Sequence, residues 1–183
     1  MTYLKNPNQK LYSAKKILII GNGGRENALA WALNKSNQVK EILITPGNGG
    51  SENISRCSCL DIKENDSTEI IKTCLSKAID LVIIGPEAPL AAGVADDLRE
   101  SGITVFGPGK KGAQLEASKD WAKTLMKQAN IPTARHWTVN NLKDALSIIE
   151  ESKQLLVVKV NGLAAGKGVT VPERKEDSIK AVK

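Results

Sequence analysis

The sequence predicts an α/β protein whose first part is a doubly wound, Rossmann-like parallel sheet. Short aliphatic runs recur along residues 15–107, and an unbroken run of this kind is typical of a strand buried on both faces. A turn rich in glycine or proline follows most of these runs, and stretches with the helical period of 3.6 residues lie between them. Repeated strand, turn and helix indicate parallel strands joined by crossover helices. The predicted strands cover residues 17–20, 42–44, 54–60, 81–84 and 104–106.

The first predicted strand leads into a polar, glycine-rich turn and then a helix at about residues 25–34. The turn consists of Gly21, Asn22, Gly23, Gly24, Arg25 and Glu26. A helix N-terminus attracts anions, and the planar guanidinium of Arg25 can grip a phosphate group. A dinucleotide fingerprint would need a third glycine where Glu26 stands and an acid after the second strand, where residues 45–48 are Thr-Pro-Gly-Asn. A smaller phosphate ligand therefore fits better, and a tight turn with an exposed arginine is the alternative.

Two further loops follow predicted strands and carry special residues. Gly47 and Asn48 open a second glycine-rich loop, and Pro86 and Glu87 lie in a loop expected over residues 85–90. The carboxyl ends of parallel strands lie at one edge of a sheet, where open α/β sheets bind their ligands. We therefore expect the three loops to converge on one crevice.

A domain boundary is predicted at residues 107–112, which contain only glycine, proline and lysine and so disfavour both helix and strand. Beyond it we expect one helix over residues 114–129, with Leu115 facing inward and Lys119 near its middle. Asn140 or Asn141 caps a second helix, and a third starts near residue 173. Residues 155–171 read LLVVKVNGLAAGKGVTV, which predicts a strand, a glycine-rich loop and a second strand.

This glycine-rich loop has the composition of a polyphosphate receptor. Three glycines at positions 162, 166 and 168 let the backbone lie close to a ligand, and Lys159 and Lys167 bracket them. The spacing is not that of a P-loop, since three residues separate the first two glycines and Lys167 precedes another glycine. A flap over a nucleotide is the closer mechanical analogue. A flexible hairpin with solvated lysines is the alternative.

Composition narrows the function classes. Of 183 residues, 41% are hydrophobic and 25% charged, as in ordinary globular proteins, and the net charge of +6 comes from scattered lysines. No basic stripe with stacking aromatics indicates nucleic-acid binding, and no apolar run approaches the roughly 18 residues of a membrane span. Three cysteines and no signal peptide favour reduced thiols in the cytoplasm. The single histidine, His136, is interpreted as a surface residue, and we expect a monomer that binds small molecules.

Five segments carry a family likeness in one order: KILIIGNGGRENALAWAL, TPGNGG, IGPEAPLAAGVADDLRESGITVFGP, AQLEASK and VVKVNGLAAGKGV. With them, residues 15–183 resemble the glycinamide ribonucleotide synthetase (phosphoribosylamine–glycine ligase) family of the ATP-grasp superfamily. The resemblance implies ATP-dependent ligation of glycine to 5-phosphoribosylamine through glycyl phosphate, giving glycinamide ribonucleotide, ADP and phosphate for purine biosynthesis. It also implies a phosphoribosylamine-binding pre-ATP-grasp domain (15–107), a linker and helix (108–122) and an incomplete ATP-grasp domain (123–183). The polar residues 1–14, which precede the resemblance, are expected to form a flexible tail.

The resemblance also implies site residues. Phosphoribosylamine would be held by Asn22, Gly23, Gly24, Arg25, Glu26, Gly47, Asn48, Pro86 and Glu87. ATP would be held by Lys119, Lys159, Gly162, Leu163, Ala164, Ala165, Gly166, Lys167 and Gly168. Mg²⁺ or Mn²⁺ would accompany ATP, with ligands expected outside these 183 residues, and no catalytic or metal-binding residue is assigned within them.

Two departures from the family pattern matter. Asn27 stands where the family usually has histidine, and Asn161 where it usually has aspartate, so neither position offers a proton-transfer group. Because the family's adenine hinge, magnesium carboxylates and glycine site lie further along, we expect an amino-terminal part of a longer protein that has no ligase activity alone. The alternatives are a nicotinamide-dependent oxidoreductase, a non-catalytic phosphosugar- or nucleotide-binding module, and a related carboxylate–amine ligase.

Overall fold

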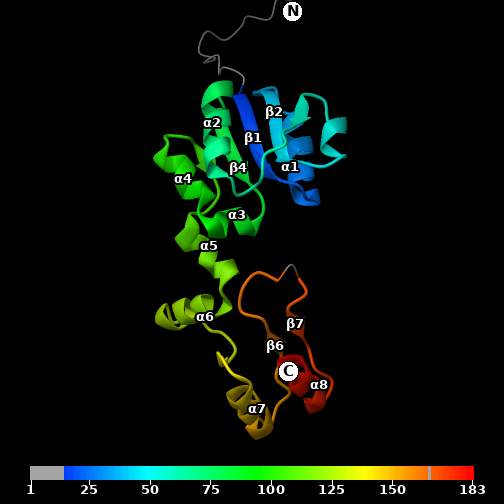
Figure 1. Cartoon of the computed structure of the whole chain (residues 1–183), viewed down its shortest axis with the longest axis vertical. Helices are drawn as coiled ribbons and strands as arrows, with labels where there is room; N and C mark the ends of the chain where they lie inside the picture. Colours follow the sequence, from blue (N-terminus) through cyan, green and yellow to red (C-terminus); the bar gives the residue numbers. More distant parts are fainter. Residues whose placement is uncertain (1–14, 165) are drawn as a thin grey trace, which may run out of the picture. The chain divides into compact units, whose positions relative to one another are not determined.

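The computed structural model describes residues 15–164 and 166–183, which fall into two compact units (Figure 1). Met1–Lys110 forms the first unit and Lys111–Lys183 the second. The tail predicted for residues 1–14 lies outside the described residues, as does Ala165 of the predicted nucleotide loop.

The first unit is built on a five-stranded sheet in the order β3-β2-β1-β4-β5, in which every neighbouring pair is parallel. The predicted doubly wound parallel sheet is thereby confirmed. The chain proceeds from β1 outward to one side and returns to build the other side, which creates a topological switch point between β1 and β4. The strands are β1 (Lys15–Gly21), β2 (Val39–Pro46), β3 (Cys57–Cys59), β4 (Leu81–Ile84) and β5 (Val105–Phe106).

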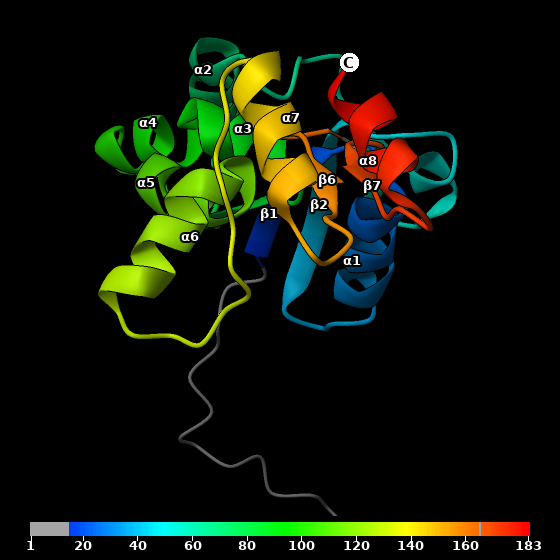
Figure 2. The ribbon, with the colours of Figure 1, turned by 90° about the horizontal axis from the view of Figure 1, so that it is seen from below.

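The central strand is buried on both faces, as its aliphatic sequence predicts. On one face, Ile17 and Ile19 pack with isoleucines of β2 and with α1 (Gly24–Asn34). On the other face Leu18 and Ile20 are fully buried, and α2 (Ser67–Lys77) and α4 (Val94–Glu100) lie on this side of the sheet (Figure 2). Each such side chain stabilises the fold by about 1.5–3 kcal/mol through burial.

The loop predicted over residues 85–90 is only partly present, because α3 (Glu87–Ala92) begins within it. Pro86 is the N-cap with extended backbone (φ −81°, ψ 157°). Pro89 falls in the first turn of α3, where the helix needs no backbone N–H from it. Gly93, at φ +109°, ends α3 and begins α4. Glu87 therefore stands at the first helical residue rather than in an irregular loop.

The prediction of a single helix over residues 114–129 is wrong. Two helices occur instead, α5 (Lys110–Ala117) and α6 (Lys119–Gln128). Ser118 separates them with extended backbone (φ −137°, ψ 109°), and its Oγ accepts the N–H of Trp121 at 3.2 Å as the N-cap of α6. Lys119 is consequently the first residue of α6 and not a mid-helix residue.

The start of α5 also differs from the prediction. Residues 110–112 are helical although their composition predicts irregular backbone. The carboxylate of Asp96 accepts the N–H of Lys110 at 2.7 Å and so satisfies one of the donors that a helix start leaves open. Leu115, predicted to face inward, is exposed. A contact from distant sequence thus decides where this helix begins.

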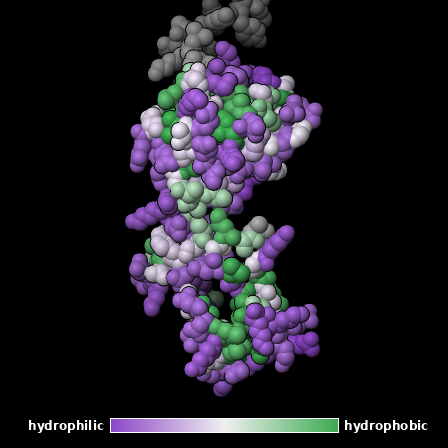
Figure 3. Space-filling model, in the orientation of Figure 1, coloured by the Kyte–Doolittle hydropathy of each residue, from purple (hydrophilic) through white to green (hydrophobic). Residues whose placement is uncertain are grey.

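The predicted strand, loop and strand form an antiparallel hairpin of β6 (Val158–Lys159) and β7 (Val169–Thr170), with strands shorter than the sequence suggests. Asn141 caps α7 (Leu142–Glu151) by accepting the N–H of Asp144 at 2.9 Å, as predicted. The predicted last helix is α8 (Lys175–Val182), whose Ser178 donates its hydroxyl to Leu156 O at 2.8 Å. Hydrophobic residues of the hairpin remain exposed, and Figure 3 shows hydrophobic surface on this unit.

The three cysteines carry free thiols. Cys57 and Cys59 share one face of β3 and pack against the α1 side of the core. Burial raises the pKa of both thiols, and it raises the pKa of Cys74 to about 11. Across residues 15–164 and 166–183, no three or more His, Cys, Asp or Glu side chains are grouped to hold a metal ion. Over the same residues, no helix combines the length and apolar character needed to cross a bilayer.

Candidate functional site

Glu26 ties the first glycine turn to the start of α1. Gly23 is the N-cap, with extended backbone (φ −91°, ψ −179°), and its N–H donates to the Glu26 carboxylate at 2.8 Å. This contact is one half of a capping box. The first N–H groups of α1 have no partner within the helix, so its N-terminus carries partial positive charge. The turn is therefore suited to an anionic ligand.

Asn48 joins the second loop to the first. Its Nδ2 donates to Asn22 O at 2.8 Å, and its Oδ1 accepts the backbone N–H groups of Gly50 at 2.9 Å and Ser51 at 3.2 Å. Gly47 has φ +73°, and a Cβ at this position would lie 2.5 Å from the sulfur of Cys59. Only glycine fits this bend without displacing the neighbouring strand. One amide side chain thus fixes the spacing between the carboxyl ends of β1 and β2.

Arg25 reaches the third loop. Its Nη1 donates to Gly85 O at 2.7 Å, and its Nη2 lies 3.4 Å from a carboxylate oxygen of Glu87. Its Nε is 3.4 Å from Glu26 Oε1. The guanidinium therefore spans the switch point between β1 and β4 while more than half of the side chain stays exposed.

The three loops thus meet at the carboxyl ends of β1, β2 and β4, where sequence reasoning expects them to converge. The structure brings all the residues predicted for phosphoribosylamine to this edge of the sheet. They are Asn22, Gly23, Gly24, Arg25, Glu26, Gly47, Asn48, Pro86 and Glu87.

Glu64 is a further residue at this site that the sequence does not predict, and it lies close enough to Glu26 for the two carboxylates to interact electrostatically. The hydroxyl of Thr45, at the end of β2, bonds to Ile62 O at 2.6 Å and holds the loop after β3 across this edge. Burial, and then the negative charge of Glu26, raise the pKa of Glu64. The sequence also does not predict that Asn27 lies beside the second loop. A Cβ on Gly50 would lie 3.1 Å from Asn27 Nδ2, which shows how close the two residues are. Glu64 stands in none of the motifs that the sequence shows, and Asn27 stands in the first motif without any local sign that it approaches Gly50.

In the second unit, Lys119 meets the glycine-rich loop. Its Nζ donates to Gly162 O at 2.9 Å, and the neighbouring Asp120 N–H lies 3.3 Å from Asn161 Oδ1. The start of α6 therefore holds the entry to the loop, a contact that the predicted uninterrupted helix would not suggest.

The other predicted nucleotide residues that the structure describes belong to the loop itself or to its two ends. Gly162 and Gly166 have φ of +116° and +76°, which favours glycine at both positions. Val160 N–H donates to Gly168 O at 2.8 Å and closes the base of the loop. Lys159 and Lys167 are exposed at its two ends, and Leu163 and Ala164 lie between them. Backbone amides and ammonium groups are thus available on one loop.

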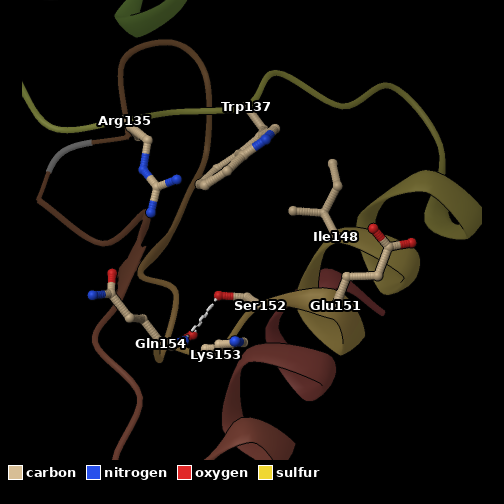
Figure 4. A pocket seen from close by; sticks show the side chains of 7 residues that line it. All are labelled: Arg135, Trp137, Ile148, Glu151, Ser152, Lys153 and Gln154. Carbon is tan, nitrogen blue, oxygen red and sulfur yellow. Dashed lines mark hydrogen bonds between the residues drawn. The ribbon is translucent and has the colours of Figure 1, made fainter.

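A cavity of about 470 Å³ lies elsewhere in the second unit (Figure 4). Trp137 stacks within 5.8 Å of the Arg135 guanidinium on one side, and α7 with the turn after it provides the other side. His136 is exposed, as predicted, and lines a separate hollow with Thr124. These two cavities are lined by none of the predicted site residues within the described part of the chain.

Two family models match the chain in succession. The model for the phosphoribosylglycinamide synthetase N domain matches residues 15–116. The model for the phosphoribosylglycinamide synthetase ATP-grasp (A) domain matches residues 117–183. Together they cover the whole stretch that the sequence resemblance covers.

Individual relatives agree with this assignment. The chain is 46% identical over 167 residues to the phosphoribosylamine–glycine ligase of Nostoc sp., covering 91% of this chain and 39% of the relative. It is 46% identical over 170 residues to the human trifunctional purine biosynthetic protein adenosine-3, covering 92% of this chain and 17% of that protein. The chain therefore spans well under half the length of these relatives.

Solved structures give the same result. The crystal structure of the Thermotoga maritima phosphoribosylamine–glycine ligase superimposes with a TM-score of 0.68 at 31% identity, over 90% of this chain and 38% of that one. An N5-carboxyaminoimidazole ribonucleotide synthetase in complex with ADP matches with a TM-score of 0.72 at 19% identity, over 94% of this chain and 45% of that one, which shows the fold alone. On the two consecutive family matches, this chain belongs to the phosphoribosylglycinamide synthetase family.

Proposed function

We propose that the chain belongs to an enzyme that ligates glycine to 5-phosphoribosylamine at the expense of ATP. The products would be glycinamide ribonucleotide, ADP and phosphate, with glycyl phosphate as the intermediate. The family matches and the names of the relatives support this reaction. We also propose that the enzyme acts on these small molecules as a monomer in the cytoplasm, and the three free thiols of this chain favour that compartment.

The observation that carries the proposal is the meeting of three loops at one edge of the sheet. Asn48 bonds to the first loop at 2.8 Å and Arg25 bonds to the third at 2.7 Å, so the loops form one surface. That surface offers a helix N-terminus and a guanidinium for a phosphate group, and carboxylates for hydroxyl or amine donors. Phosphoribosylamine carries a phosphate group, hydroxyl groups and an amine, and we propose that it binds here.

ATP is proposed to bind at the glycine-rich loop of the second unit. Lys119 holds this loop through Gly162 O, and Lys159 and Lys167 stand at its ends. Ammonium groups and backbone amides neutralise the charge of a triphosphate and of the phosphoryl group in transfer. Lys119, Lys159 and the backbone amides of residues 162–164 and 166–168 would therefore orient the γ-phosphate toward the glycine carboxylate.

The chemistry needs positioning more than acid–base groups. Phosphorylation of the glycine carboxylate replaces a poor leaving group by phosphate, and the amine of phosphoribosylamine then attacks the acyl carbon. Holding both reactants in place supplies much of the rate enhancement. Mg²⁺ would neutralise charge on ATP in this family, but the described residues include no grouped ligands for it, so no residue is assigned to that ion.

We place the domain division in residues 108–122, between a phosphoribosylamine-binding domain (15–107) and the ATP-grasp portion (123–183). The compact units divide between Lys110 and Lys111, and the family matches divide between residues 116 and 117. Both divisions fall inside the proposed linker.

A crossed calorimetric titration tests the two sites. We expect Arg25→Ala to weaken binding of ribose 5-phosphate about tenfold and to leave ATP binding unchanged, because a guanidinium–phosphate contact is lost. We expect Lys159→Ala to weaken ATP binding about tenfold and to leave ribose 5-phosphate binding unchanged. Lys72→Ala is the control, because it also removes one positive charge but does so on the exposed face of α2, outside both sites. If neither Arg25→Ala nor Lys159→Ala changes either affinity, both site assignments are wrong.

A further inference from the structure

Glu26 is a buried carboxylate with one oxygen left open. Its side chain is only 3% exposed. Oε2 accepts the N–H of Gly23 at 2.8 Å, whereas Oε1 is buried and accepts no hydrogen bond from any residue in the ranges 15–164 and 166–183. A buried charged oxygen without a donor is unfavourable, so this atom is poised to accept one.

The backbone around Glu26 is shaped to admit this carboxylate. A Cβ on Gly21 would lie 2.5 Å from Glu26 Cγ, and a Cβ on Gly85 would overlap the carboxylate itself. Gly21 ends β1 and Gly85 follows β4, so the side chain occupies the switch point where α/β sheets bind ligands. Two glycines thus make room for an acid where an apolar side chain would pack at lower cost.

Arg25 lies beside the open oxygen, but its contact with that oxygen is long. Its Nε lies 3.4 Å from Glu26 Oε1 without forming a hydrogen bond, and its Nη2 is 3.4 Å from Glu87. Its one short contact is to Gly85 O at 2.7 Å, and 56% of the side chain is exposed. Both contacts of the guanidinium to carboxylates are long, so an incoming anion can compete for it at the cost of the hydrogen bond to Gly85 O.

We propose that Glu26 is the specificity-determining acceptor of the phosphosugar site. When the ligand's phosphate draws the Arg25 guanidinium away, a hydroxyl or amine of the ligand donates to Glu26 Oε1 in its place. The inference rests on the proposed phosphosugar site and adds that the site selects phosphate esters that carry a hydrogen-bond donor. Phosphate binding and donor recognition are coupled because one arginine serves both.

The charges around Glu26 favour a donor over a second acceptor. Glu64 and Glu87 lie near it, and Arg25 is the cation in contact with Glu26 and Glu87 in the described structure. Burial is the main cause of the raised pKa of Glu64, and the negative charge of Glu26 adds to it. A bare phosphate ester would leave Glu26 Oε1 without a donor and beside an anion, whereas a sugar phosphate would satisfy it.

Calorimetry with two phosphate monoesters tests the inference. Ribose 5-phosphate carries hydroxyl donors, and methyl phosphate carries the same phosphate group with none. We expect the wild-type chain to bind ribose 5-phosphate about tenfold more tightly than methyl phosphate, and Glu26→Gln to remove most of this preference. Glu26→Gln should leave methyl phosphate affinity unchanged or raise it, since a nearby negative charge is lost.

Glu41→Gln is the matched control, because Glu41 pairs with Lys16 at the opposite end of the strands. It should leave both affinities unchanged. Equal preference in wild type and Glu26→Gln, or an equal loss for both ligands in Glu26→Gln, overturns the inference while the phosphosugar site stands. No binding of ribose 5-phosphate to wild type overturns the proposed site as well. The wild-type comparison of the two esters needs no variant, so a Glu26→Gln chain that fails to fold still leaves a test.

Discussion

Gly21→Ala is expected to destabilise the first unit by about 4 kcal/mol and to lower its melting temperature by roughly 15 °C. Gly21 has φ +133°, a conformation that residues with a Cβ rarely adopt. The added Cβ would also lie 2.5 Å from Glu26 Cγ and 2.9 Å from Pro86 Cδ. Strain and overlap therefore act together at the end of the central strand. Thermal unfolding followed by circular dichroism measures the effect.

Gly49→Ala is the control, because Gly49 has open space around it and no positive φ. It should change the melting temperature by no more than a few degrees. The double variant Gly21→Ala/Glu26→Ala should recover part of the loss, since it removes one of the two overlaps. If Gly21→Ala and Gly49→Ala have the same melting temperature, the packing assigned to Glu26 at the switch point is incorrect.

Lys119→Ala is expected to weaken ATP binding about 50-fold, the largest effect on affinity that we predict. Lys119 supplies a positive charge beside the glycine-rich loop and also holds that loop through Gly162 O at 2.9 Å. Its removal takes away a phosphate ligand and loosens the backbone that carries the other ligands, so the two losses add. Calorimetry or fluorescence with a nucleotide analogue measures the affinity.

Lys143→Ala offers a matched control for this experiment. Lys143 likewise stands near a helix start, at the beginning of α7, but it is exposed, whereas Lys119 is half-buried. It should leave ATP affinity within about twofold of wild type. An ATP affinity of Lys119→Ala equal to that of Lys143→Ala would remove Lys119 from the nucleotide site and leave the hairpin lysines to be tested alone.

The parallel sheet was accessible from sequence because its strands are buried on both faces. The run over residues 17–20 contains no polar residue, and such a run admits few other readings in a short segment between turn signals. The ends of α5 and α6 were harder to predict from the sequence. Ser118 is compatible with a helix interior, and only the structure reveals that its hydroxyl caps α6 instead. The start of α5 depends on Asp96, a residue from another helix.

The candidate site likewise has parts that the sequence predicts and parts that it does not. Its loops could be predicted because glycines and a guanidinium after a strand have a local meaning, and strand polarity then brings the loops together. Glu64 could not be predicted, because its approach to Glu26 depends on how Thr45 anchors a loop from another strand. The contact of Lys119 with Gly162 likewise joins residues distant in sequence, and only the family resemblance suggested a role for Lys119.

Backbone amide shifts of the ¹⁵N-labelled chain test the two-site proposal most directly. Ribose 5-phosphate is expected to shift the amide signals of residues 21–26 and 47–50 and of Gly85 and Glu87, and ATP those of residues 119, 159–164 and 166–168. A ribose 5-phosphate response confined to residues 111–183, or an ATP response centred on residues 21–26, would contradict it.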